Sequence, residues 1–204
     1  MSRKQHWDTA YDQKSEGQFS WHQETPALSL ELMQEAGITR ACSVIDIGGG
    51  TSRIVDSLLD MGLSDIAVLD LSENALRAAQ RRLGMPGATV TWIAADITTW
   101  QAGRQFDIWH DRAVFHFLID PADRAAYIRA LSDSLSPGGH AIIATFAPDG
   151  PDKCSGLPVQ RYSPDMLAAT LGVQFKLLRH HHHLHQTPWG TPQAFQFSLF
   201  RKTG

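Results

Sequence analysis

The amino-acid sequence predicts an α/β protein in which helices cover both faces of a mostly parallel sheet. Short apolar runs rich in β-branched residues alternate with segments whose apolar residues recur at helical spacing. Near the C-terminus, two further runs are joined by a turn-rich loop, which predicts an antiparallel hairpin. The 204 residues suit one domain with a sizeable core, so we expect a single domain over residues 1–204.

The first predicted strand, residues 44–47, is short, apolar and mostly β-branched. A glycine turn, Gly48-Gly49-Gly50, separates it from a helix that begins near Ile54. Upstream, we expect a helix with Thr25 as its N-cap and Gly37 at its end. Strand, glycine turn and helix together bring backbone N–H groups close to a ligand at a helix N-terminus.

The later elements continue the alternation. Ser72 and Ser163 are expected to cap helices, and a third helix starts at Asp120 and is broken by Pro137-Gly138-Gly139. The remaining expected strands are residues 65–70, 88–94, 106–110, 140–146, 173–184 and 194–201. With residues 44–47 these make a seven-stranded sheet, and parallel sheets bind ligands at the carboxyl ends of their strands.

Residues 1–25 are polar but carry four aromatic side chains: Trp7, Tyr11, Phe19 and Trp21. One interpretation is that these rings anchor the segment to the domain surface. The other is that residues 1–25 form a lid segment over the ligand cleft and exclude water.

Composition excludes several classes of partner. The net charge of −3, without a basic run, gives no reason to expect nucleic acid. The two cysteines form no CxxC pair, so we expect a reducing compartment and no structural zinc. No apolar run has membrane-spanning length and we see no secretion signal, so no membrane association and a cytoplasmic location are expected.

The chemistry of the glycine turn depends on its neighbours. A dinucleotide fingerprint would have a third glycine where Arg53 stands, and no Gly-Lys-Ser/Thr follows for a P-loop. Instead, an acid stands two residues before the first glycine. The arrangement Asp46-Ile47-Gly48-Gly49-Gly50 resembles motif I of the class I S-adenosylmethionine (SAM)-dependent methyltransferases.

This resemblance implies a Rossmann-like seven-stranded fold, SAM as cofactor and S-adenosyl-L-homocysteine (SAH) as product. In the family the turn wraps the methionine part of the cofactor, and the acid after the third strand meets the adenine amino group. A carboxylate at the end of the second strand can accept both ribose hydroxyls. The residues assigned to the cofactor site are Asp46, Gly48, Gly49, Gly50, Ser52, Asp70, Leu71, Asp96, Ile97, His110, Arg112 and Trp21.

The segment after the fourth strand, residues 110–117, is the best clue to the acceptor. It lacks the Asn/Asp-Pro-Pro-aromatic sequence typical of adenine- and glutamine-directed relatives. An Asp followed by a basic and a small residue resembles small-molecule thiol and metalloid methyltransferases, and also some lysine methyltransferases. We expect Asp111, His110 and His116 as catalytic residues near the reactive methyl. Alternatively, Asp111 and Arg112 form a structural ion pair and His116 is a satisfied helix residue.

Two further features allow more than one interpretation. Cys154, in the loop after the fifth strand, could bind a soft acceptor, but a lone loop cysteine is usually incidental. His181, His183 and His185 share one side of a strand and could bind a metal. We favour no metal and an exposed strand end, with His185 entering the acceptor pocket.

The sequence therefore predicts a SAM-dependent methyltransferase that acts on a small molecule and leaves its oligomeric state open. A protein lysine methyltransferase is the alternative within the class. From other classes, an NAD-type oxidoreductase or a non-catalytic nucleotide-binding module remains. Two features argue against an NAD-binding protein: Arg53 replaces the third glycine of the dinucleotide fingerprint, and the predicted sheet ends in a C-terminal hairpin.

Overall fold

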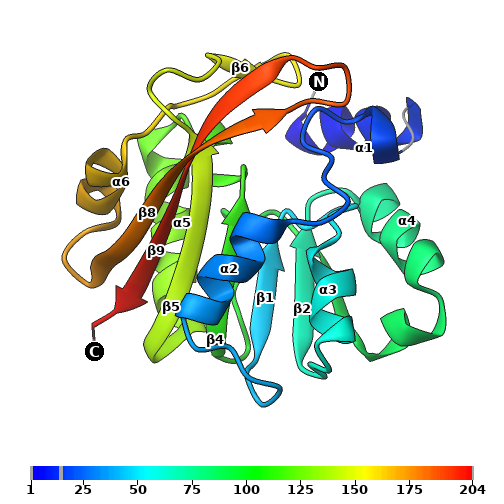
Figure 1. Ribbon diagram of the computed structural model, residues 1–204, viewed down its shortest axis with the longest axis horizontal. Coiled ribbons are helices and arrows are strands. Elements are labelled where there is room, and N and C mark those ends of the chain that lie inside the picture. The colour runs from blue at the N-terminus through cyan, green and yellow to red at the C-terminus, as the bar shows by residue number, and fades with distance from the viewer. Residues whose placement is uncertain (1, 14–15, 204) are drawn as a thin grey trace.

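The computed structural model describes residues 2–13 and 16–203, and Figure 1 shows one twisted sheet with helices on both faces. The seven strands of that sheet are β1 (Val44–Ile47), β2 (Ile66–Asp70), β3 (Thr91–Ala94), β4 (Phe106–Arg112), β5 (Leu135–Phe146), β8 (Phe175–Gln186) and β9 (Pro192–Lys202). A separate small hairpin is formed by β6 (Lys153–Cys154) and β7 (Leu157–Pro158). The α-helices are α1 (Arg3–Gln13), α2 (Ala27–Glu35), α3 (Ile54–Asp60), α4 (Glu73–Leu83), α5 (Pro121–Ser134) and α6 (Pro164–Leu171).

The strand order is β3-β2-β1-β4-β5-β9-β8. The pairs from β3 to β5 are parallel, whereas β9 is antiparallel to both β5 and β8. Strand β9 therefore lies between β5 and its own hairpin partner, β8. This confirms the predicted fold class, including the C-terminal antiparallel hairpin.

Alternation along the strands divides the core into two layers. Val44 packs with Leu32 of α2 and Leu58 of α3 on one face of the sheet. Ile45 packs on the other face, in the layer that contains Tyr127 of α5. Figure 1 shows α2 and α3 in front of the sheet and α5 behind it. Asp46 follows Ile45, so its side chain points to the α2 face.

Three predicted helix starts are confirmed by side-chain caps. The Ser72 hydroxyl accepts the Ala75 amide at 3.3 Å, and the Ser163 hydroxyl accepts the Met166 amide at 3.1 Å. The Asp120 carboxylate likewise caps α5. Each cap satisfies an amide that has no partner inside its helix.

Some predicted boundaries are wrong. Thr25 is not the N-cap of α2; Pro26 holds that position without a side-chain bond, and the Thr25 carbonyl accepts the Ala27 amide at 2.9 Å. The third strand begins at residue 91, not 88, because residues 85–89 form a 3-10 turn with a proline in its first positions. The hairpin strand β8 starts and ends two residues later than predicted.

The fifth strand is longer than predicted, and the fourth extends two residues further, to Arg112. Pro137-Gly138-Gly139 does follow the end of α5, but the chain stays beside β4 there. Gly138 has a φ of 77°, and the pairing jumps from Leu135 to His140 while β4 advances only two residues. The expected break is thus a bulge inside a strand.

Among the described residues, no helix is long and apolar enough to cross a membrane.

Candidate active site

The glycine turn lies at the carboxyl end of β1, where it bends the chain toward α3. The amides of Gly48 and Gly49 both donate to the carbonyl of Leu69, at 2.7 and 3.2 Å. These bonds tie the turn to the end of β2. Gly48 and Gly50 have φ values of 65° and 41°, a left-handed region that glycine adopts without strain. The turn therefore brings bare backbone to the edge of the sheet where strands β1 and β2 end.

Neighbouring side chains leave no room for a Cβ in this turn. A Cβ on Gly48 would collide with the side chain of Val114. A Cβ on Gly49 would collide with the Asp46 carboxylate and lie 2.6 Å from Val68 Cγ1. The turn is thus a cradle whose close approach to its surroundings requires glycine.

Asp46 is held in a buried polar chain. Its Oδ1 lies 2.6 Å from Nδ1 of His110, and Nε2 of the same ring lies 2.9 Å from the Ser29 hydroxyl on α2. All three side chains are buried. The other carboxylate oxygen of Asp46 is also buried and has no hydrogen-bond partner among the described residues. A buried acceptor without a donor is costly, so this atom fits a ligand's N–H group.

Asp70 ends β2 beside the glycine turn. Its Oδ1 accepts the Ser72 amide at 2.8 Å. Burial raises the pKa of this carboxyl to about 7, although the amides of Ser72 and Gly50 favour the charged form. The side chain of Tyr11 covers the turn here, because a Cβ on Gly50 would lie 2.7 Å from its hydroxyl. Asp70 therefore provides a shielded acceptor next to the cradle.

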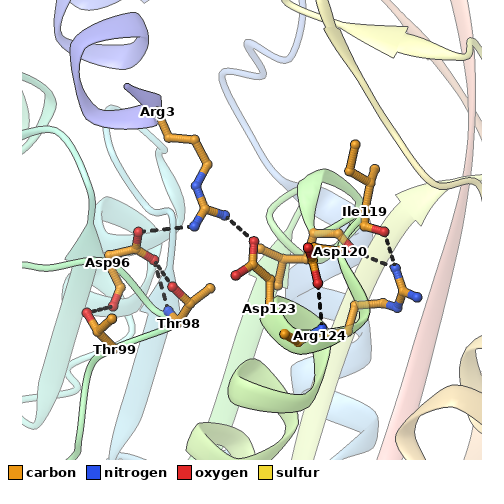
Figure 2. Close-up of polar contacts among 10 residues, drawn as sticks. Arg3, Asp96, Thr98, Thr99, Ile119, Asp120, Asp123 and Arg124 are labelled. Atoms are coloured by element: carbon orange, nitrogen blue, oxygen red, sulfur yellow. Dashed lines mark hydrogen bonds and ion pairs between the residues drawn. The ribbon is translucent and has the colours of Figure 1, made fainter. Parts of the chain in front are cut away.

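Asp96 follows β3, and Figure 2 shows how its two oxygens are used. One accepts the amide and hydroxyl of Thr98, at 2.9 and 2.7 Å. The other accepts Nη2 of Arg3 at 3.4 Å, while Nη1 of the same guanidinium donates to Asp123 of α5 at 3.1 Å. Arg3 therefore bridges the ends of two separate elements from above.

Helix α1 lies on the cleft through polar contacts. No residue of α1 is buried. Besides Arg3, Asp8 accepts the Ser72 hydroxyl at 2.7 Å, and Asp12 accepts the side-chain amide of Asn74 at 2.9 Å. These bonds join α1 to the start of α4.

The rings of the lid segment, including Trp7 of α1, form an aromatic cluster. Trp7 lies against Phe117 and Trp21, with ring centroids 5.2 and 5.8 Å apart. Trp21 stacks on Phe19, which is 2 % exposed and anchors the segment. Phe19 is therefore an anchor, as one interpretation expects, and Trp7 and Trp21 line the cleft, while the exclusion of water by a lid stays a prediction.

These parts enclose one cleft at the carboxyl ends of β1, β2, β3 and β4. The space between its lining atoms is about 1070 Å³, open solvent at the mouth included, which is ample for a nucleoside-sized ligand. The predicted site residues that line it are Asp46, Gly48, Gly49, Ser52, Asp70, Leu71, Asp96, Ile97, His110, Arg112 and Trp21. Gly50, Asp111 and His116 do not line it.

Asp111 points away from the cleft because β4 continues through it. His110 and Arg112 share one side of the strand, so Asp111 faces the other. There its carboxylate accepts the amides of Val114 and Phe115, at 2.8 and 3.1 Å. It also accepts the Tyr127 hydroxyl, at 2.6 Å. Asp111 and Arg112 do not form an ion pair either.

His116 is fully buried between aromatic rings and outside the cleft. Its Nδ1 accepts the Phe146 amide at 3.3 Å, and burial lowers its pKa to about 3. The ring is therefore neutral at physiological pH. Its Nε2 has no hydrogen-bond partner among the described residues.

Several lining residues were not expected from sequence: Val114, Phe117, Leu118, Gln193 and Phe195. The first three follow β4, which ends at Arg112, two residues later than predicted. Gln193 and Phe195 come from β9, whose place beside β5 depends on long-range pairing. These two residues could have been predicted only from the register of the hairpin, which no local sequence pattern gives. Cys154, noted in sequence, also lines the cleft, and burial raises the pKa of its thiol to about 12.

The histidine-rich strand does not gather a metal site. In the described parts of the chain, no group of three His, Cys, Asp or Glu side chains could hold a metal ion. His185 is buried but is not among the cleft-lining residues, and its Nε2 donates to the Ser20 carbonyl at 2.6 Å. His182 pairs with Asp149 at the surface, at 3.0 Å.

Comparison with known proteins agrees with this geometry. Residues 44–139 match a protein-family model described as a methyltransferase domain. The cradle, the acids at three strand ends and the seven-stranded sheet with its antiparallel hairpin agree with a class I SAM-dependent methyltransferase domain, as the resemblance of the glycine turn implied.

The individual proteins that resemble this chain share only a small part of its sequence. Nodulation protein S from Rhizobium tropici is 26 % identical over 80 residues, an alignment that spans 39 % of this chain but only 33 % of that protein. Two solved structures share the fold over nearly the whole chain. The 1,6-didemethyltoxoflavin N1-methyltransferase from Burkholderia thailandensis, with its substrate and SAH bound, has a TM-score of 0.74 at 21 % identity, covering 98 % of this chain and 87 % of its own. The N-methyltransferase NodS from Bradyrhizobium japonicum, with SAH bound, has a TM-score of 0.71 at 16 % identity, covering 97 % and 98 %.

Proposed function

We propose that this protein transfers the methyl group of SAM to a small-molecule acceptor bound under the lid segment. The observation that carries the proposal is that one cleft joins the glycine cradle, Asp70 and Asp96, while an Asp46 oxygen there is left without a donor. Solved structures of similar fold hold SAH, and one also holds its small-molecule substrate.

The residues present fit SAM. The orphaned oxygen of Asp46 would accept the amino group of the methionine part, beside the crowded glycines. Asp70 would accept the ribose hydroxyls. Asp96 would take the adenine amino group, with Ile97 against the ring. Ser52, Leu71 and Trp21 complete the walls of this part of the cleft.

The cofactor supplies an electrophilic methyl group on a sulfonium. What the chain provides is alignment of the acceptor and exclusion of water. His110 holds Asp46 in place, since both of its ring nitrogens are engaged. The part of the wall formed by Phe117, Cys154, Gln193 and Phe195 contains no carboxylate or imidazole. We therefore propose that the acceptor arrives ready to react and needs no general base.

A small acceptor is favoured over a protein lysine because the acceptor end of the cleft is roofed. Trp7 contacts both Trp21 and Phe117, and all three rings line the cleft. Asp111, Tyr127 and His116 support this roof from outside the cleft, and we now assign them positioning roles through the chain after β4.

The test is a methyl-transfer assay with isotopically labelled SAM. Purified protein would be offered thiols, amines and carboxylic acids of low molecular mass and, separately, lysine-rich protein substrates. Label in a small molecule supports the proposal, whereas label only in protein would assign the lysine alternative. Binding of SAH without transfer to any acceptor would favour a binding module.

A further inference from the structure

Arg112, the last residue of β4, places a partly buried cation at the edge of the cleft. It lines both the main cleft and an adjoining polar recess under Trp21. Its Nη1 donates to the side-chain oxygen of Gln23 at 2.6 Å. Among the described residues, no carboxylate forms an ion pair with it. A guanidinium has five N–H donors, so most of its capacity is unused.

The charge of Arg112 interacts with groups on the cleft wall, but it makes no ion pair with a carboxylate of the described residues. Burial lowers its pKa, while the Asp46 charge raises it. Asp46, however, is already bonded to His110. Burial lowers the pKa values of His183 and His185 on β8, and the Arg112 charge lowers them further. A partly buried cation without an ion-pair partner is incompletely compensated, which favours an anionic ligand.

The guanidinium is also oriented. Gln23, which accepts from Arg112, lies 3.4 Å through its Nε2 from Nδ1 of His185. His185 is fixed in turn by its bond to the Ser20 carbonyl. This chain of bonds joins the lid segment to β8 and holds one edge of the planar guanidinium. The remaining edge is available for the two-point binding that carboxylates make with arginine.

The surroundings define the rest of the ligand. The recess is lined by Trp21, His22, Gln23, Thr51, Ser52, Arg53 and Arg112, a set with no acid. The adjacent part of the cleft offers the rings of Trp21, Phe117 and Phe195. An acidic group beside flat apolar walls suits a small aromatic acid.

We infer that Arg112 binds the carboxylate of the methyl acceptor, so that the acceptor is a small aromatic carboxylic acid. The inference rests on the proposed function and adds the substrate class. The other possible source of a carboxylate is the methionine part of the cofactor, and the experiment separates the two.

The experiment measures binding by calorimetry and tryptophan fluorescence. Wild-type protein saturated with SAH is titrated with benzoate and with benzamide, its neutral analogue. We expect benzoate to bind at least tenfold more tightly. Arg112→Gln should abolish this preference, and Arg112→Lys should restore part of it. Arg77→Gln is the matched control, since Arg77 is an exposed residue of α4 paired with Glu73.

A second titration uses SAH and 5′-methylthioadenosine, which lacks the amino-acid part. If Arg112→Gln weakens SAH and leaves 5′-methylthioadenosine unchanged, the carboxylate belongs to the cofactor and the inference is overturned. Equal binding of benzoate and benzamide to the wild type would also overturn it. Unchanged SAH affinity in Arg112→Gln shows that the variant is folded. Failure of the wild type to bind SAH would instead contradict the proposed function.

Discussion

At the scale of single residues, Asp70 is the group whose protonation the fold perturbs near neutral pH. Its pKa rises to about 7 on folding, chiefly through burial, from its ordinary value of 3.8. The native state therefore retains a proton that the unfolded chain releases. Stability should consequently decrease as pH rises from about 4 to about 7.

Asp70→Asn should flatten this pH dependence, because the amide does not titrate. Urea denaturation of both proteins without ligand, at several values between pH 4 and pH 8, measures the effect. Asp111 contributes a slope of the same sign, since burial raises its pKa to about 6, so some dependence should remain. A variant with the full wild-type slope would show that Asp70 is not the responsible group.

Asp111→Ala should destabilise the protein by about 2–4 kcal/mol, because two amides and the Tyr127 hydroxyl lose a buried acceptor. Chemical denaturation of the variant measures the loss, and methyl transfer by its folded fraction separates stability from chemistry. Wild-type stability with lost turnover would return Asp111 to the catalytic site.

The residue types at the strand ends could be predicted because parallel strands share one carboxyl edge. Asp46, Asp70 and Asp96 were found in this way and line one cleft. The direction of the Asp111 side chain could not be predicted, because the sequence pattern ends the strand at His110 and leaves Asp111 in a loop. The two extra strand residues decide by alternation which side it faces.

At the scale of elements, the glycine turn is the least tolerant part of the site. Gly49→Ala should reduce SAH affinity at least tenfold, because its Cβ would displace Val68 and the Asp46 carboxylate. Calorimetry measures the change. Gly103→Ala is the matched control, because nothing lies within 4 Å of a Cβ there. Wild-type affinity in Gly49→Ala would remove the turn from the binding site.

Helix α1 contacts the cleft through the ring of Trp7 and through exposed ion pairs of Arg3, and such ion pairs are individually worth only about 0–1 kcal/mol. Arg3→Ala should therefore leave global stability within about 1 kcal/mol of wild type. It should nevertheless speed SAH dissociation several-fold, because the bridge from Asp96 to Asp123 closes the cleft. Stopped-flow fluorescence of Trp7 and Trp21 follows the release. An unchanged dissociation rate, with Arg77→Ala as control, would mean that α1 is not a lid.

Secondary-structure elements could be predicted where local sequence determines them. The prediction failed where pairing with a distant strand determines them. The caps of α4, α5 and α6 follow from Ser72, Asp120 and Ser163. The bulge at Gly138 does not, because only the neighbouring β4 keeps that irregular segment in the sheet.

At the scale of the whole molecule, a seven-stranded sheet carries a row of acids at its carboxyl edge, and the lid segment contacts the cleft that these acids line. The order of β9 between β5 and β8 brings Gln193 and Phe195 to the same cleft. The sequence indicates the hairpin that makes this possible. Which side chains it delivers depends on register, and only the folded chain reveals it.

Isothermal titration of the wild-type protein with SAH and, separately, with NAD tests the central claim most directly. The account predicts that one SAH binds per chain and that NAD does not bind, because the cradle serves an amino-acid end and not a pyrophosphate. Binding of NAD without binding of SAH would contradict it.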